Sequence, residues 1–249
     1  MAPTILPRII IIGATSLIAE HCARLWVQSA VELILVGRSP TRLMSIADDL
    51  RVRSPDSRIL TCEADFHDPA AITALARDLT EPTRADIVLI AHGSLPDQSA
   101  CESSLTMVRE AIEVNALSPV LFAEAFAGRM AERGTGRLAV IGSVAGDRGR
   151  KTNYVYGAAK GMLERYVQGL QHRLASTGVR VTLIKPGPTA TPMTAHLSPS
   201  GLADPEQVAR HLVAAIARGV SVAYIPGKWW LIMMVIRHLP RTVFNKLNI

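Results

Sequence analysis

Three side chains in this 249-residue sequence have the types and spacing needed for proton transfer: a serine, a tyrosine and a lysine. Ser143 follows a short apolar run, and Tyr156 precedes Lys160 by four residues, so the last two share one face of a helix. An ammonium group beside a tyrosine lowers the hydroxyl pKa from about 10 towards the working range. Tyr156 would then donate a proton to a ketone oxygen as hydride reaches the carbon, with Ser143 hydrogen-bonded to the same oxygen.

The tyrosine–lysine spacing alone is weak evidence, because such pairs are common on exposed helix faces. Tyr154 is not the tyrosine of this pair, since Ala158 stands four residues after it. The order of strand, serine, tyrosine and lysine after a nucleotide-type turn is much rarer by chance. We therefore predict that these groups form one catalytic site.

A glycine turn follows the first apolar run and opens a helix. Such a turn presents backbone N–H groups to a phosphate. Only Gly13 of the three usual glycines is present, with Leu17 and Ala19 at the other two positions, so the turn alone could be purely structural. The residues expected to approach the cofactor here are Gly13, Thr15, Ser16, Leu17 and Ile18.

Arg38 follows the second apolar run, where an NAD site normally carries an acidic residue. An acid repels the extra phosphate of NADP, whereas an arginine can bind it with two hydrogen bonds. Arg42 lies one helical turn further on; the alternative is a solvated loop arginine. We predict NADPH as the preferred cofactor and NADH as the lesser alternative.

Two further groups of residues follow the third and fourth apolar runs. Asp65 and Phe66 are expected to meet the adenine, and Ala91, His92 and Gly93 to lie beneath the ribose. A single histidine such as His92 is more often structural than catalytic.

Apolar runs alternate with helix-length segments along the whole chain. This rhythm predicts one α/β domain: a Rossmann fold with a doubly wound, seven-stranded parallel sheet and helices on both faces. Ligands bind beyond the carboxyl ends of such strands. The expected strands are 8–12, 32–36, 58–60, 86–90, 137–141, 179–184 and 221–225, and the expected helices are 16–29, 41–50, 70–79, 105–132, 155–176 and 205–218.

The amino-acid composition limits which binding partners and which cellular compartment are expected. Aromatic residues make up only 4%, which argues against a nucleic-acid partner that stacks bases, while the net charge of +6 suits an anionic membrane, a phosphate-bearing substrate or simple solubility. The three cysteines form no metal or disulfide pattern, which fits the cytoplasm. The N-terminal stretch is not a signal peptide, and no run reaches the roughly 18 apolar residues of a membrane span.

The C-terminal segment 228–249 is a separate feature after the domain at 1–227. Its stretch KWWLIMMVIRH is apolar nearly all round as a helix and must be covered by protein or lipid. Two tryptophans at one end and basic residues at the other suit a peripheral position on a membrane surface. The alternative is packing on the domain or on a second subunit.

The motifs, taken in order, resemble the short-chain dehydrogenase/reductase family: GATSLIA, AHG, EVNA, Ser143, the Tyr156–Lys160 pair and KPGPTAT. The resemblance implies a catalytic tetrad of Asn115, Ser143, Tyr156 and Lys160. It also implies that Asn115 opens a helix around a water, that Lys160 contacts the nicotinamide ribose, and that dimers or tetramers form on the two long helices. The residues implied to flank the nicotinamide are Pro186, Gly187, Thr189 and Thr191. Ala91 and His92 depart from the usual Asn-Asn-Ala-Gly pattern.

The tail, together with GSVAGDRGRKTNYVYGAAKGML and PMTAHL, resembles one branch of that family. In this branch a flavin-dependent oxidase forms a 2-keto sugar on a polyprenyl phosphate, and the reductase completes the epimerisation for cell-envelope arabinan synthesis. That implies a lipid-linked ketone at the inner membrane face, with Arg148, Arg150 and Lys151 near its phosphate unless they are merely solvated. Two alternatives remain: a reductase or dehydrogenase of a soluble ketone or alcohol with the tail as an oligomer interface, and a non-enzymatic nucleotide sensor.

Overall fold

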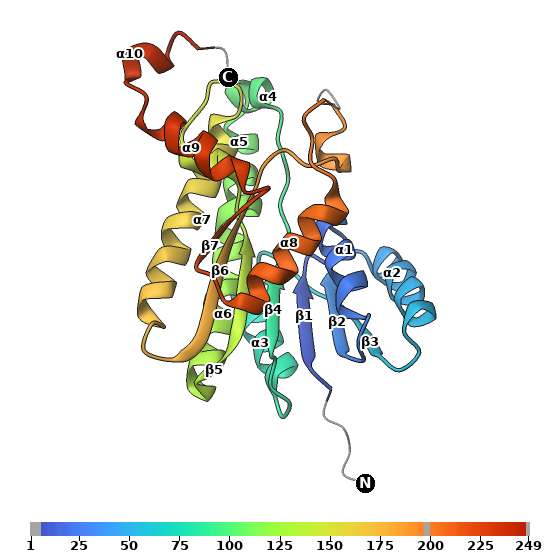
Figure 1. Ribbon diagram of the computed structural model, residues 1–249. Coiled ribbons are helices and arrows are strands. Elements are labelled where there is room, and N and C mark those ends of the chain that lie inside the picture. The colour runs from blue at the N-terminus through green and yellow to red at the C-terminus, as the bar shows by residue number, and fades with distance from the viewer. Residues whose placement is uncertain (1–5, 197–199, 248–249) are drawn as a thin grey trace.

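The computed structural model describes residues 6–196 and 200–247. Leu197 of the PMTAHL motif and the last two residues of the tail lie outside this part. Seven strands form one parallel sheet, as predicted, and their order is β3-β2-β1-β4-β5-β6-β7 (Figure 1). The strands are β1 Arg8–Ile12, β2 Glu32–Gly37, β3 Arg58–Glu63, β4 Ile87–Ile90, β5 Thr135–Ile141, β6 Gly178–Pro186 and β7 Val222–Ile225.

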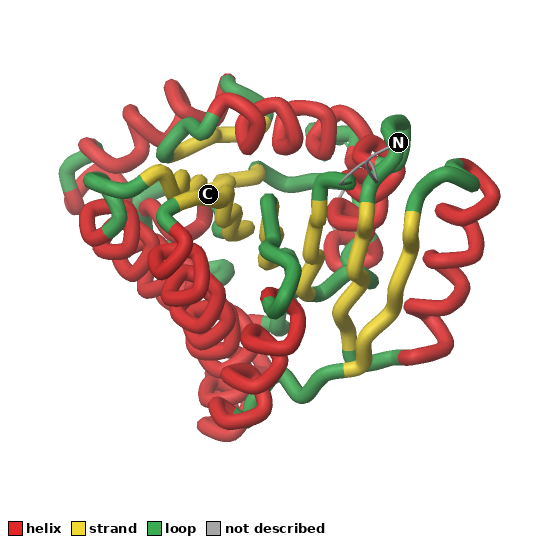
Figure 2. Tube along the Cα trace, turned by 90° about the horizontal axis from the view of Figure 1, so that it is seen from below, coloured by secondary structure: helices red, strands yellow, loops and turns green. Residues whose placement is uncertain are grey.

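Helices cover both faces of the sheet, which explains why the strands are uniformly apolar (Figure 2). Successive side chains of β1 enter opposite cores: Ile9 and Ile11 pack in one, Ile10 and Ile12 in the other. The first core is closed by α1 Leu17–Trp26, α2 Pro40–Arg53 and α8 Pro205–Arg218. The second is closed by α3 Pro69–Thr80, α6 Ser118–Arg133 and α7 Tyr154–Arg173.

Local sequence signals set several helix ends. Asp68 and Asp204 cap α3 and α8 through their carboxylates, each followed by a proline in the first turn. Gly134 and Gly219 end α6 and α8 in the left-handed conformation that glycine adopts without strain. The aspartates fix where α3 and α8 begin, and the glycines end α6 and α8 so that the chain can return to the sheet.

The single helix predicted over 105–132 is divided in the structure. It consists of α5 Leu105–Ile112, a π-helical segment Glu113–Leu117 and α6, and a further short helix, α4 Gln98–Ser103, precedes it. The continuous stretch Leu105–Arg133 is long and apolar enough to cross a membrane by composition alone. Phe122 and Phe126 are nevertheless fully buried in the second core, so hydropathy here reflects packing on the sheet.

The tail forms α9 Lys228–His238 and the short α10 Arg241–Phe244. The first of these runs across the carboxyl end of the sheet beside α7 (Figure 1). Met233 is its buried residue, whereas Leu231 and Val235 are 63% and 62% exposed. The predicted helix is thus confirmed, with one side on the domain and an apolar side facing outward.

Candidate active site

A cavity of about 680 Å³ lies across the carboxyl ends of the strands. It spans the point where the strand order reverses between β1 and β4, the usual ligand position in open α/β sheets. All but two of the predicted site residues line it; the two exceptions are Asn115 and Asp65. The lining residues among the predicted set are Gly13, Thr15, Ser16, Leu17, Ile18, Arg38, Phe66, Ala91, His92, Gly93, Ser143, Tyr156, Lys160, Pro186, Gly187, Thr189 and Thr191.

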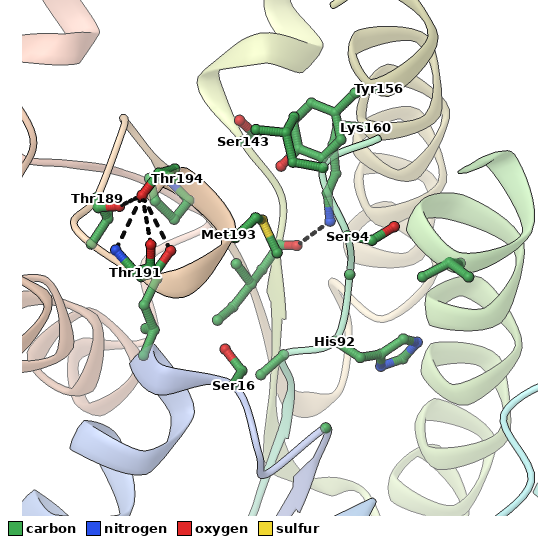
Figure 3. A pocket seen from close by; sticks show the side chains of 18 of the residues that line it. Ser16, His92, Ser94, Ser143, Tyr156, Lys160, Thr189, Thr191, Met193 and Thr194 are labelled. Atoms are coloured by element: carbon green, nitrogen blue, oxygen red, sulfur yellow. Dashed lines mark hydrogen bonds between the residues drawn. The ribbon is translucent and has the colours of Figure 1, made fainter. Parts of the chain in front are cut away.

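Ser143, Tyr156 and Lys160 meet at one side of this cavity (Figure 3). Ser143 follows β5 in extended conformation, and the other two project from the same face of α7. Lys160 is 3% exposed, and its ammonium donates to the carbonyl oxygen of Ile141 at 3.1 Å. This bond fixes the lysine beside the end of β5, 5.8 Å from the centre of the Tyr156 ring.

The electrostatics of Tyr156 differ from the prediction. Burial raises the pKa of its hydroxyl, while the hydrogen bond with Ser143 and the charge of Arg150 oppose that rise. Burial also lowers the pKa of Lys160 to about 8. The predicted lowering of the tyrosine pKa by Lys160 is therefore wrong for this structure, because desolvation of the phenol outweighs every opposing effect and the cation that acts on it is Arg150.

Asn115 lies in the π-helical segment and is fully buried. Its side-chain nitrogen donates to the carbonyl of Ala111 at 2.9 Å, and its oxygen accepts from the Ser94 N–H at 2.9 Å. The widened turn gives the side chain room to reach back along its own helix. Asn115 thus joins the helix to the loop after β4 that carries Gly93 and Ser94, and reaches the cavity only through these neighbours.

The nucleotide end of the cavity is built by β1 and β2. Gly13 has φ +80°, and a Cβ there would lie 2.7 Å from the backbone nitrogen of His92, so only glycine fits this crossing. Arg38 lines the cavity from the end of β2, and Arg42 donates to the carbonyl of Thr15 at 3.1 Å. Glu20, the one carboxylate among the lining residues described, is paired with Arg24 at 2.6 Å. The cradle therefore suits a phosphorylated nucleotide.

Of the predicted residues after β3 and β4, Phe66 and His92 pack inward and Asp65 is exposed. Phe66 and His92 stack edge to face with ring centres 4.8 Å apart and lie against Phe122. The imidazole contacts Ser118 at 2.9 Å, and burial lowers the pKa of His92 to about 3, so this ring stays neutral. Asp65 is exposed and accepts from the His67 N–H at 2.7 Å, which places it at the rim.

The loop after β6 forms the wall facing the catalytic residues (Figure 3). The Thr194 hydroxyl stabilises this loop: it accepts from the Thr191 N–H at 3.1 Å and donates to the carbonyl of Thr189. Five further residues line the cavity although no sequence motif had indicated them as site residues: Thr194, Met193, Ser94, Ser118 and Asn153. Of these five, Thr194 is the one that the sequence could have indicated, through the capping pattern Thr191-Pro-Met-Thr194.

A buried ionic cluster supports the Ser143 loop from behind. Lys185 on β6 is 1% exposed and pairs with Asp147 and, at 2.7 Å, with Glu164. The hydroxyl of Tyr224 donates to Asp147 at 2.9 Å. One lysine thereby joins β6, β7, α7 and the loop that follows Ser143.

The three basic residues after Ser143, expected together near a substrate phosphate, are separated by the structure. Arg148 donates to the carbonyls of Ile236 and Leu239 in the tail, the second at 2.7 Å. Arg150 lines the cavity, and Lys151 is exposed outside it. Arg150 alone is therefore placed to meet a substrate.

The fold and the paired groups in this cavity define an oxidoreductase of the dinucleotide-binding α/β class. The family model described as short chain dehydrogenase matches residues 7–201, so the chain belongs to that family. An uncharacterised oxidoreductase of Mycobacterium tuberculosis is 32% identical over 241 residues, 96% of each chain. A second, from Streptomyces coelicolor, is 31% identical over 241 residues, covering 96% of this chain and 95% of the relative.

Solved structures share the whole fold. A short-chain dehydrogenase from Sphingobium yanoikuyae in complex with NADPH has a TM-score of 0.82 at 24% identity, covering 98% of this chain and 97% of that one. A short chain dehydrogenase from Burkholderia cenocepacia in complex with NADP has a TM-score of 0.83 at 16% identity, covering 98% of each. Both likenesses establish the fold.

Proposed function

We propose that this chain reduces a ketone to a secondary alcohol with NADPH. The observation that carries the proposal is the meeting of Ser143, Tyr156 and Lys160 in one cavity whose other end holds the Gly13 turn and Arg38. Bound NADPH supplies the hydride. The chain's own groups then have to hold the ketone, deliver a proton and keep the nucleotide in place.

Each catalytic group has one part in this proposal. The Tyr156 hydroxyl donates its proton to the ketone oxygen, and Ser143 holds that oxygen by a hydrogen bond. Lys160, fixed by the Ile141 carbonyl, would hold the ribose of bound NADPH through its ammonium and would return a proton to the tyrosine. Asn115 acts through Ser94 and the widened helix, and so holds the floor of the site in position.

The preference for NADPH over NADH is supported by charge. Arg38 and Arg42 border the nucleotide end, and no carboxylate from the end of β2 faces it among the lining residues described. A guanidinium binds a phosphate with two parallel hydrogen bonds. The relatives solved with NADPH and NADP are consistent with this cofactor.

A finer proposal concerns the substrate: a polyprenyl-phosphoryl 2-keto-pentose, reduced in the second half of an epimerisation. The sequence resemblance to the reductase subunit of decaprenylphosphoryl-ribose 2′-epimerase supports it, and a flavin-dependent oxidase would then supply the ketone. The tail adds a physical reason, because the outward side of α9 is apolar and no acidic residue follows Glu206 in the sequence. Such a surface suits a cytoplasmic enzyme that rests on an anionic membrane.

The reaction is tested by replacing the proton donor. We expect Tyr156→Phe to lose at least about 10²-fold in ketone reduction, the usual contribution of a general acid, while NADPH still binds. Turnover is measured as NADPH oxidation with polyprenyl-phosphoryl 2-keto-pentose beside simple soluble ketones, and binding by NADPH fluorescence. Parental turnover in the variant would refute the assignment, and failure of the parent to bind NADPH would instead favour a non-enzymatic role.

The membrane part is tested on the outward side of α9, which we define as Trp230, Leu231, Met234 and Val235. The parent should sediment with phosphatidylglycerol vesicles and not with phosphatidylcholine vesicles. The double variant Leu231→Ser, Val235→Ser should lose this without a change in molecular mass. A fall in mass instead would identify the tail as an oligomer interface and favour the alternative, a soluble ketone or secondary alcohol.

A further inference from the structure

We infer that Trp229 is a positioning residue for the nicotinamide end of the site, so that the tail is part of the cofactor-binding structure. The inference rests on the proposed use of NADPH and adds a residue that no catalytic motif contains. It depends on how the tail meets two loops that border the cavity.

The first contact lies behind the turn that follows β6. Gly187 lines the cavity, and its N–H donates to the Ile225 carbonyl at 2.9 Å. A Cβ built on Gly187 would overlap Nε1 of Trp229, so the indole rests directly on the glycine backbone. Trp229 itself is not among the lining residues. The indole therefore supports the turn from the side away from the cavity.

Trp229 holds this place because α9 begins there. Its N–H donates to the Pro226 carbonyl at 3.0 Å, immediately after the end of β7. β7 pairs with β6 in register, Ile225 opposite Pro186. The sheet thus sets the distance between the turn and the helix start, and the indole fills that distance.

The second contact holds the far end of the same helix. Arg148, on the loop after Ser143, donates to the carbonyls of Ile236 and Leu239, and a cation at a helix C-terminus is favourable. Its guanidinium carbon also lies 3.8 Å from the ring centre of Phe244. The tail is therefore attached at both ends to loops that border the reacting groups.

These contacts give the tail a part in catalysis that is separate from any membrane. A displacement of about 1 Å in a supporting element can reduce turnover by about 10²-fold. Removing the indole leaves the Gly187 turn without support on one side. By linkage, if the seated tail favours NADPH binding, bound NADPH must favour the seated tail.

The test is a double-mutant cycle on NADPH binding, without membranes, using Gly187→Ala and Trp229→Ala. We expect Trp229→Ala to weaken NADPH binding about tenfold and to lower kcat further, because the nicotinamide is held less well. Gly187→Ala should be as damaging in the parent, since its methyl overlaps the indole. In the Trp229→Ala background the same methyl has room, and its added effect should fall below about twofold.

Trp230→Ala is the matched control, since it removes the same side chain one position along, where the indole is 49% exposed. It should leave NADPH binding and soluble-ketone turnover at parental values. If Trp229→Ala does not fold, the cycle is run with Trp229→Leu, which leaves similar room. Equal cost of Gly187→Ala in both backgrounds would overturn the inference and leave the proposed function intact. No NADPH binding by the parent would overturn both.

Discussion

At the scale of single residues, the catalytic groups are controlled by burial and by one unexpected cation. Lys160 is buried enough for its pKa to fall to about 8, while the pKa of Tyr156 is raised by burial and moderated by Ser143 and Arg150. Both shifts follow from removing ionisable groups from water. The acid–base behaviour of the site should therefore change within the accessible pH range.

The lysine gives the first pH prediction. The ammonium form is lost as pH rises through about 8, so NADPH binding and turnover should decline above that value. Lys160→Arg should move the decline to higher pH, at reduced turnover, because a guanidinium stays charged. NADPH affinity measured by fluorescence from pH 6 to 10 checks this. A flat profile in the parent would contradict the placement of the ammonium near the cofactor.

Arg150 gives a second prediction. Its charge opposes the rise in the pKa of Tyr156, so Arg150→Gln should raise that pKa further. Alcohol oxidation with NADP⁺ needs the deprotonated phenol, so we expect its rise with pH to begin at higher pH in this variant, with slower ketone reduction at neutral pH. Lys151→Gln removes the same charge from an exposed neighbour outside the cavity and should leave the profile unchanged. Equal shifts in the two variants would show a general charge effect.

At the scale of secondary-structure elements, the Lys185 cluster joins parts of the fold that are far apart in sequence. Burial opposes the charge of Lys185, but hydrogen bonds and attraction from Asp147 and Glu164 outweigh it and raise the pKa of the lysine. The cluster fixes the loop after Ser143 against β6 and α7. Stability and site geometry thus depend on the same three groups.

Lys185→Met should destabilise the protein by about 3–5 kcal/mol, because it leaves the buried carboxylate of Asp147 and the partly buried one of Glu164 without their cation. Urea unfolding gives this value, and Lys151→Met on the exposed loop should stay within about 0.5 kcal/mol of the parent. A folded pKa above the ordinary 10.5 means that this stabilisation is complete below 10.5 and is lost as pH rises beyond it. A Lys185→Met variant as stable as the parent would show that the cluster adds no net stability.

At the scale of the whole molecule, two of the regions with exposed apolar side chains lie on helices. One is the outward side of α9; the other lies along the long helices and includes Ile112, Leu117 and Met162. Homo-oligomers commonly bury exposed apolar side chains of this kind, on long helices, in a symmetric interface. We therefore propose that subunits meet along α5, α6 and α7, and not through the tail.

Light scattering should then give a mass of two or four times 26.9 kDa for the parent. Leu117→Glu should reduce it towards one subunit, because the patch cannot bury a charge cheaply. The Leu231→Ser, Val235→Ser variant serves as the control and should keep the parental mass. A parent that is monomeric at all concentrations would refute this assignment of the patch.

The sheet and its order of elements were predictable because each strand of the sequence is apolar on both faces and each intervening segment has a helical period. Seventeen of the nineteen predicted site residues line the cavity, since the position after a parallel strand largely determines the place of a side chain. The family resemblance implied that Asn115 opens the helix, but the division at Glu113–Leu117 could not be read from the helical period of 105–132, because it depends on a bond from Asn115 to its own helix. The pKa of Tyr156 and the packing of Trp229 on Gly187 were not predictable either, because they depend on burial and on contacts distant in sequence.

The direction in which the chain crosses the sheet has a practical consequence. It enters β1 at Arg8, at the amino ends of the strands, and its last helices, α9 and α10, lie on the side of the carboxyl ends, where the cavity is (Figure 1). A bead or electrode coupled ahead of Arg8 should therefore leave the mouth accessible, whereas coupling behind α10 should obstruct it. Enzyme immobilised by its beginning would keep its specific activity, and enzyme immobilised by its end would not.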